Sequence, residues 1–207
     1  MHLEALTSKA RKLLPKLKNF HGCVLGRGTA LALEIGHRIS VDFDFFIKGE
    51  ISRSLFDKTK RVFKGCSLKT LVNSKDQLTV LIDGVKITFL AYPYPTLYRT
   101  IHGDGIHMFT VEEIAATKAY TIGRRAEYKD YIDLYFIISK SRRALKRIIK
   151  SAEKKYDKEF SQKLFLEQLV YLKDIEETPI AFIKKEVKKK TLETFFRNEI
   201  RKMRLIV

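Results

Sequence analysis

The sequence predicts a mixed α+β fold in which a small mixed sheet with flanking helices is followed by a basic helical bundle. Residues 20–92 contain several short β-type runs, and Asp83-Gly84 joins two of them as a tight hairpin turn would. From Thr110 onwards almost every segment has helical periodicity. Apolar residues make up 45% of the 207 residues, which is enough to build a hydrophobic core.

Each expected element has a local signal. Residues 1–19 place leucines among lysines and arginines, which is typical of a basic amphipathic helix. Residues 29–35 are helix formers, and Gly36 is expected to end that helix. Residues 91–109 contain prolines and glycines and are expected to form a loop. The expected strands are 23–25, 40–47, 68–72, 78–82 and 85–90.

These elements suggest two domains, a core over residues 1–105 and a helical bundle over residues 106–207. The chain carries 41 Lys and Arg against 24 Asp and Glu, a formal net charge of +17. Residues 139–207 hold 20 of these basic and 10 of these acidic side chains, so the bundle is strongly basic. A single lysine run is often only a solvated surface, but the whole excess favours a polyanionic partner such as RNA.

Composition also excludes several classes of protein. The two cysteines, Cys23 and Cys66, form no C-x-x-C pair, which rules out a disulfide scaffold and a cysteine-rich zinc site. No apolar run approaches the roughly 18 residues of a membrane span, and no signal peptide opens the chain. We therefore expect a cytoplasmic protein that makes no membrane contact.

The most informative stretch is the acidic strand Ser40-Val41-Asp42-Phe43-Asp44. Alternation along a strand places Asp42 and Asp44 on one face, with apolar neighbours on the other. Two adjacent carboxylates repel each other unless a positive charge lies between them. Mg²⁺ would supply that charge, because it favours one or two carboxylates together with substrate phosphates. The alternative is an amphipathic strand whose two acids face water.

A glycine-containing turn precedes the acidic strand, with the sequence Gly26-Arg27-Gly28-Thr29 before a helix. Glycines let a phosphate approach the backbone, and a helix N-terminus offers N–H groups and partial positive charge. In isolation the segment is more typical of a tight turn between a strand and a helix. Followed by two carboxylates on the next strand, it fits a metal-bound nucleoside triphosphate.

Residues 28–33, Gly-Thr-Ala-Leu-Ala-Leu, and residues 36–46, Gly-His-Arg-Ile-Ser-Val-Asp-Phe-Asp-Phe-Phe, together resemble the AbiEii/AbiGii toxin family. That family belongs to the nucleotidyltransferase superfamily, which is related in fold to polymerase β. Residues 92–95, Tyr-Pro-Tyr-Pro, are similar to the same family, as is the segment from residues 114–118 to residues 128–135. The resemblance extends over roughly residues 20–140 and keeps the family's motif order.

The resemblance implies an enzyme that moves a nucleotide from an NTP to an RNA acceptor, the tRNA 3′ end, with Mg²⁺ or Mn²⁺. It implies a toxin held in check by a protein antitoxin. Asp42 and Asp44 would hold the metal, and Lys118 would neutralise the triphosphate. Residues expected to bind the nucleotide or its phosphates are Gly26, Arg27, Gly28, Thr29, Arg38, Ser40, Arg124 and Lys129. The supporting acids would be Asp130 and Asp133.

Several of these residues also have structural interpretations. Lys118 lies on the apolar face of a helix that begins at a capping box, so it must snorkel, pair with an acid or reach a ligand. Asp130 and Asp133 share a helix face, and could anchor Lys118 or Arg124 or support the site directly. Arg124 could cap a helix end as readily as bind phosphate, and Arg38 could pair with one of the strand acids.

Two residues depart from the family pattern. Thr88 stands on the polar face of the 85–90 strand, where a third carboxylate is expected, and Arg27 stands where the family usually has glycine. They motivate a second function, a non-catalytic RNA-binding or regulatory module on a degenerate scaffold. A third alternative is a small-molecule nucleotidyltransferase. The net charge of +17 fits RNA better than a cationic small acceptor.

Overall fold

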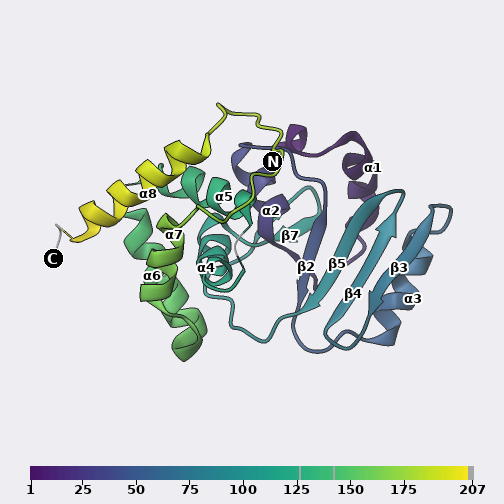
Figure 1. The fold of residues 1–207 in the computed structure, drawn as a ribbon. Helices are drawn as coiled ribbons and strands as arrows, with labels where there is room; N and C mark the ends of the chain where they lie inside the picture. Colours follow the sequence, from purple (N-terminus) through teal and green to yellow (C-terminus); the bar gives the residue numbers. More distant parts are fainter. Residues whose placement is uncertain (126, 142, 205–207) are drawn as a thin grey trace. The chain divides into compact units, whose positions relative to one another are not determined.

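The computed structural model describes residues 1–125, 127–141 and 143–204 (Figure 1). The chain divides into two compact units. The first, which we call the sheet unit, comprises Met1–Tyr94 and Arg99–Thr110. The second, the helical unit, comprises Pro95–Tyr98 and Val111–Val207. The domain division predicted from sequence, 1–105 and 106–207, stays a prediction, because compactness does not test whether either part folds alone.

The sheet unit is built on a seven-stranded mixed sheet in the order β3-β4-β5-β2-β1-β7-β6. β2 pairs in parallel with β5, and β1 pairs in parallel with β7, whereas the other neighbours are antiparallel. The mixed α+β fold predicted from sequence is therefore confirmed. The strands are β1 Val24–Leu25, β2 Phe43–Ile47, β3 Leu68–Asn73, β4 Gln77–Ile82, β5 Val85–Ala91, β6 Ile101–Gly103 and β7 Ile106–Met108.

Aromatic side chains form the core on one side of this sheet. The rings of Phe45 on β2 and Phe89 on β5 stack with centroids 5.4 Å apart. Phe20 packs 4.9 Å from Phe89 and 6.1 Å from Phe63, which follows a helix that the sequence analysis missed. The helices of this unit are η1 Leu3–Ala5, α1 Ser8–Leu17, α2 Arg27–Ile35 and α3 Arg53–Val62.

The helix predicted over residues 1–19 is interrupted. Leu6 is extended and bridges to Ser40, so a 3-10 turn comes first and α1 begins only after Thr7, whose hydroxyl accepts from the Ala10 N–H at 3.2 Å. The helix predicted over residues 29–35 is confirmed and starts two residues earlier. It ends as expected, since Gly36 adopts a left-handed conformation at φ 58°.

The loop predicted over residues 91–109 is wrong in part, because it contains the β6–β7 hairpin. Asp104 and Gly105 both have positive φ, 48° and 80°, as do Asp83 and Gly84 in the β4–β5 turn, at 49° and 84°. Paired positive φ values are typical of the two-residue turns whose twist matches a hairpin. The sequence therefore carries the same Asp-Gly turn signal in both hairpins. The second hairpin was missed because its strands have only three residues, too few to show alternation of polar and apolar side chains.

The predicted helical bundle is confirmed over α4 to α8, but residues 171–188 are mainly irregular rather than helical. Tyr131, Phe165, Leu169 and Phe196 are among the fully buried side chains of this unit. Within the described residues, none of the helices has the length and apolar character required to span a bilayer. The elements are α4 Val111–Ile122, α5 Tyr128–Ile138, α6 Ala144–Tyr156, η2 Asp157–Glu159, α7 Gln162–Val170 and α8 Lys189–Arg204.

Candidate active site

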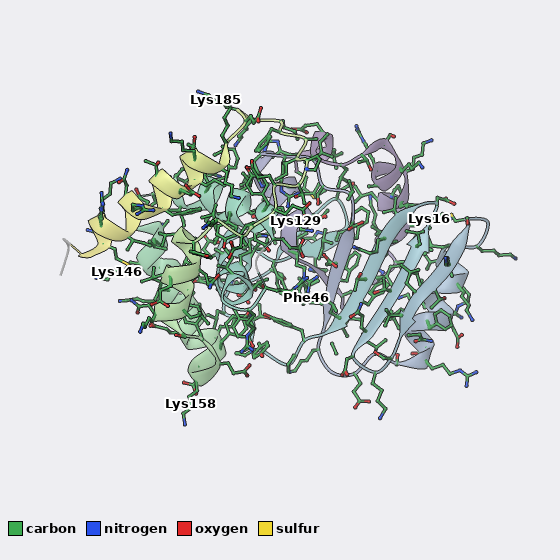
Figure 2. All side chains as sticks on the ribbon, in the orientation of Figure 1. Lys16, Phe46, Lys129, Lys146, Lys158 and Lys185 are labelled. Carbon is green, nitrogen blue, oxygen red and sulfur yellow. The ribbon has the colours of Figure 1, made fainter. Side chains whose placement is uncertain are left out.

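The turn between β1 and α2 requires glycine at residue 26, because two aromatic rings fill the space that a side chain would occupy. A Cβ atom on Gly26 would lie 2.4 Å from the Phe46 ring and 2.9 Å from the Phe109 ring, so no larger residue fits without movement (Phe46 is labelled in Figure 2). The Gly26 N–H donates to the Asp44 carbonyl at 2.9 Å, which ties the turn to β2. The first N–H groups of α2 have no acceptor within the helix, as required of an anion site.

Arg27 begins α2 with φ 53°, a left-handed conformation that is uncommon for a residue with a side chain. Its guanidinium lies 3.6 Å from Asp44 Oδ1 and 5.8 Å from the centre of the Phe46 ring. Strained backbone of this kind persists where the surrounding structure fixes it, often at functional sites. The residue that departs from the family pattern therefore contacts one of the two strand acids.

Thr29 and Ser40 lie against each other instead of pointing to water. Both are buried, and their hydroxyl oxygens are 2.7 Å apart. The Thr29 hydroxyl also donates to the Asp42 carbonyl. In this structure the two hydroxyls join α2 to the segment that carries Asp42, so they position an acid as well as lining the glycine turn. Gly28 belongs to the first turn of α2, which follows the N-cap residue Gly26.

The two strand acids alternate with buried phenylalanines, as predicted. Asp42 immediately precedes β2 and Asp44 lies within it, and both are half-buried on either side of the buried Phe43. Asp42 Oδ2 accepts from Lys86 Nζ at 2.9 Å, so each acid has a basic neighbour. Arg38, the partner suggested from sequence, donates to the Ile39 carbonyl at 3.2 Å.

Thr88 stands directly beside Asp44, because the parallel pairing of β2 with β5 aligns these two residues. The Thr79 hydroxyl donates to the Thr88 hydroxyl at 3.4 Å. In the described part of the chain no three or more His, Cys, Asp or Glu side chains cluster as a metal site. The two carboxylates still fit Mg²⁺, which needs one or two carboxylates when a nucleotide supplies phosphate oxygens.

Lys86 was missed as a site residue. Alternation along β5 places Lys86 and Thr88 on one face, and this signal was visible in the sequence. What the sequence could not show is that β5 pairs with β2, and this pairing brings the ammonium of Lys86 to Asp42.

In the helical unit, Lys118 of α4 pairs with both predicted supporting acids of α5. Its Nζ lies 2.7 Å from Asp130 Oδ1 and 2.6 Å from Asp133 Oδ2, and all three side chains are buried. Asp130 Oδ2 also accepts from the Glu127 N–H at 3.3 Å and so caps the start of α5. Of the alternatives left open by the sequence, anchoring of Lys118 by these acids is the one observed.

A second buried ion pair, Glu113–Lys155, was not foreseen. The Glu113 carboxylate accepts from the N–H groups of Leu97 at 2.9 Å and Tyr98 at 3.1 Å, and it contacts Lys155, which also donates to the Pro95 carbonyl at 2.6 Å. Burial lowers the pKa of Lys155, and its hydrogen bond to Glu113 offsets part of that effect. The pair fixes residues 95–98 to α4 and α6.

The remaining predicted phosphate ligands lie in exposed ion pairs of the helical unit. Arg124 is 3.4 Å from Glu159 and lies over the Tyr120 ring at 4.2 Å. Lys129, labelled in Figure 2, is 2.7 Å from Glu127, and its hydrogen bond is the main reason why the pKa of Glu127 is lowered. The predicted residues thus form two sets, one in each unit.

A family model described as "Nucleotidyl transferase AbiEii toxin, Type IV TA system" matches residues 69–205, a span that begins after the two strand acids and includes Thr88 and Lys118. The uncharacterized protein aq_aa25 of Aquifex aeolicus (strain VF5) is 32% identical over 204 residues, covering 96% of this chain and 98% of that protein.

Two solved structures share the fold. A candidate nucleotidyltransferase from H. pylori has a TM-score of 0.61 at 17% identity, covering 100% of this chain and 97% of that one. JHP933 from Helicobacter pylori has a TM-score of 0.54 at 16% identity, covering 97% of this chain and 99% of that one.

Proposed function

Since this chain belongs to the AbiEii nucleotidyltransferase toxin family, we propose that it transfers a nucleoside monophosphate from an NTP to an RNA acceptor. The proposed acceptor is the 3′ end of tRNA, and the proposed role is that of a cytoplasmic toxin controlled by a protein antitoxin. The observation that carries the proposal is the glycine turn at the start of α2 beside Asp42 and Asp44.

Each group in the sheet unit has a proposed task. Asp42 and Asp44 would hold Mg²⁺, which would neutralise phosphate charge and orient the α-phosphate for in-line attack when bound. The N-terminal N–H groups of α2 would receive phosphate oxygens, and Gly26 and Gly28 leave the backbone open to them. Arg27 would leave Asp44 for the triphosphate, exchanging one anion for another.

The acceptor's hydroxyl oxygen would form a bond to the α-phosphorus while the bond to pyrophosphate breaks. A threonine hydroxyl does not accept a proton at neutral pH, so Thr88 cannot serve as general base. The hydroxyl proton is therefore expected to leave to water, and we expect slow turnover compared with an enzyme that has a third carboxylate.

In the helical unit, Lys118 remains the proposed triphosphate ligand. It already has two carboxylate partners, Asp130 and Asp133, so a phosphate would replace one of them and leave the ammonium with the same number of anionic contacts. Residues 139–207 would bind the acceptor through salt-sensitive contacts to its phosphates, since they hold 20 basic side chains.

A second candidate function rests on Arg27 and Thr88, the two departures noted in the sequence, and on Lys86. Arg27 is paired with Asp44, Lys86 is paired with Asp42, and Thr88 replaces a carboxylate. A site balanced in this way without metal would suit a non-catalytic RNA-binding module. It predicts salt-sensitive tRNA binding that survives EDTA and Asp44→Ala, with no nucleotide incorporated.

The deciding experiment incubates the full chain with total tRNA, Mg²⁺ and each α-labelled NTP in turn. We expect label in RNA from one or two NTPs, lost with EDTA and in Asp42→Ala and Asp44→Ala. Asp57→Ala is the matched control, because Asp57 is an exposed acid on α3 of the same unit. Incorporation that persists in Asp44→Ala would refute the proposed site, and absence of label with intact binding would favour the module.

The toxin role is tested in cells. Expression of the chain should slow growth, and expression of Asp44→Ala to the same level should not. Growth inhibition that is equal for both proteins would contradict a toxin acting through nucleotidyl transfer.

A further inference from the structure

Residues of α6, α7 and α8 of the helical unit line a groove of about 1000 Å³. Figure 1 shows α8 beside α6 and α7, and residues of α8 contact both. The core sides of the three helices are filled by residues such as Ile148, Phe165 and Phe196. The groove therefore lies on another side of these helices, and of its lining residues only Ile149 also belongs to the buried core.

The floor of the groove is aliphatic. Ile149 is buried, while Leu166, Val170, Ile200 and Met203 line the groove and are only half-buried. Half-buried apolar side chains from α7 and α8, beside the buried Ile149 of α6, leave apolar surface in contact with water. Such surface is typical of a site that receives another apolar face.

The rim is basic. Lys146 and Lys150 of α6 and Arg197 and Arg201 of α8 line the groove and are exposed, and Figure 2 labels Lys146 at this part of the unit. Within the residues that the structure describes, none of these four cations forms an ion pair or a hydrogen bond with an acidic side chain. Among the described residues, these four cations therefore offer positive charge without a paired acid, although Glu153 and Glu167 also line the groove.

We propose that this groove binds an acidic amphipathic helix of a partner protein. An amphipathic helix lays apolar residues at i, i+3, i+4 and i+7 into a groove, and carboxylates beside that stripe would meet the four rim cations. A second copy of this chain fits poorly, because two chains of net charge +17 repel each other.

RNA also fits the groove less well than it fits the rest of the basic surface. The lining contains no aromatic ring for a base to stack on, and it includes two carboxylates, Glu153 and Glu167, that would repel phosphates. Aliphatic side chains gain nothing from a sugar-phosphate backbone. The proposal does not rest on nucleotidyl transfer, since binding at the groove needs neither NTP nor metal.

The test measures fluorescence anisotropy of a labelled peptide with the full chain at physiological salt. The peptide is a synthetic helix of about 16 residues with leucines at i, i+3, i+4 and i+7 and flanking glutamates. A peptide of the same composition, shuffled so that the leucines share no face, is its control. We expect the patterned peptide to bind at least about tenfold more tightly than the shuffled one, which is about 1.4 kcal/mol.

Groove variants then localise the binding. Leu166→Ser and Arg201→Glu should each weaken peptide binding by about tenfold or more, because hydrophobic anchors and rim charges both contribute. Lys158→Glu is the matched control, since Lys158 is an exposed lysine of η2 outside the groove lining (labelled in Figure 2), and it should leave binding unchanged. Far-UV circular dichroism verifies that each variant is folded.

Four results would overturn the proposal. The first is equal binding of the two peptides, and the second is binding that Leu166→Ser and Arg201→Glu leave unchanged. The third is loss of tRNA binding in the same variants together with displacement of the peptide by tRNA, which would make the groove an RNA surface. The fourth is tighter peptide binding by a chain that ends at residue 204, which would assign the groove to the chain's own last residues.

Discussion

Replacing Lys118 by methionine tests whether the buried charges of the helical unit balance one another. Lys118 is 6% exposed, and its two partners, Asp130 and Asp133, are 11% and 0% exposed. Methionine keeps most of the side-chain volume, so little packing is lost. Two buried carboxylates would remain without their ammonium, and removing one partner of a buried pair costs about 3–5 kcal/mol.

That cost is large beside the roughly 5–15 kcal/mol by which a domain is stable. We therefore expect Lys118→Met to lower the free energy of unfolding by about 3–5 kcal/mol, measured from urea-induced loss of helical circular dichroism. The triple variant Lys118→Met/Asp130→Asn/Asp133→Asn removes the two carboxylate charges as well as the ammonium, so no unbalanced charge stays buried. It should recover most of the lost stability, since neutralising a whole buried cluster is often nearly neutral.

The triple variant also separates the two roles of Lys118. If the lysine only joins α4 to α5, nucleotide incorporation should return with stability. If it binds the triphosphate, the stable triple variant should stay inactive, and this is what we expect. A loss below about 1 kcal/mol in Lys118→Met, the range of an exposed pair, would refute the reasoning from buried charge.

Four further predictions concern the sheet unit. Burial raises the pKa of Cys23 from 9.0 to about 11, so the folded chain keeps a thiol proton that the unfolded chain loses. Stability should therefore fall by about 2–3 kcal/mol between pH 9 and 11 relative to Cys23→Ala, measured by urea unfolding. Gly26→Ala should lower the free energy of unfolding by about 1–3 kcal/mol through overpacking, and the melting temperature should fall with it. At Gly123 an added Cβ would have no neighbour nearer than 3.7 Å, so Gly123→Ala should not lower the melting temperature in this way. Arg27→Gly removes a cation from Asp44 and should tighten Mn²⁺ binding about two- to fivefold, which corresponds to the free energy of an exposed ion pair. Electron paramagnetic resonance measures the free Mn²⁺ in this titration, and an unchanged affinity would contradict the proposed release of Asp44 by Arg27. Thr88→Asp places a carboxylate beside Asp44 and should raise incorporation by about 10²-fold if a general base is what the site lacks, in the labelled-NTP assay.

Local signals were sufficient at two positions where single residues determine the backbone. Gly36 ends α2 through its left-handed conformation, and Asp83-Gly84 makes the β4–β5 turn. The same turn chemistry at Asp104-Gly105 was overlooked, because its strands are too short to alternate visibly. The sequence analysis also missed α3, although its apolar residues share one side of the helix and Ser52 caps its start, so both signals were present in the sequence.

Within the site, alternation predicted that Asp42 and Asp44 share a face, but not which cations they meet. Lys86 reaches Asp42 only because β5 lies beside β2, and strand order is not a local property. Helical spacing placed Lys118 on an apolar face, which indicated that its ammonium needs an acid or a ligand. The same spacing placed Asp130 and Asp133 on one face as candidate acids. The partner of Glu113 is 42 residues away, and that distance along the chain hides such a pair from local patterns.

The route of the chain restricts how a gene of this kind can be divided or recombined. The chain passes from one unit to the other after Tyr94, after Tyr98 and again after Thr110. A fragment that ends at residue 94 would lack β7 and leave β1 without one of its two neighbours. A fragment that begins at residue 111 would leave Glu113 and Lys155 without the backbone groups of residues 95–98. We therefore expect a helical unit exchanged between relatives to keep these contacts only when residues 95–98 are inherited with it.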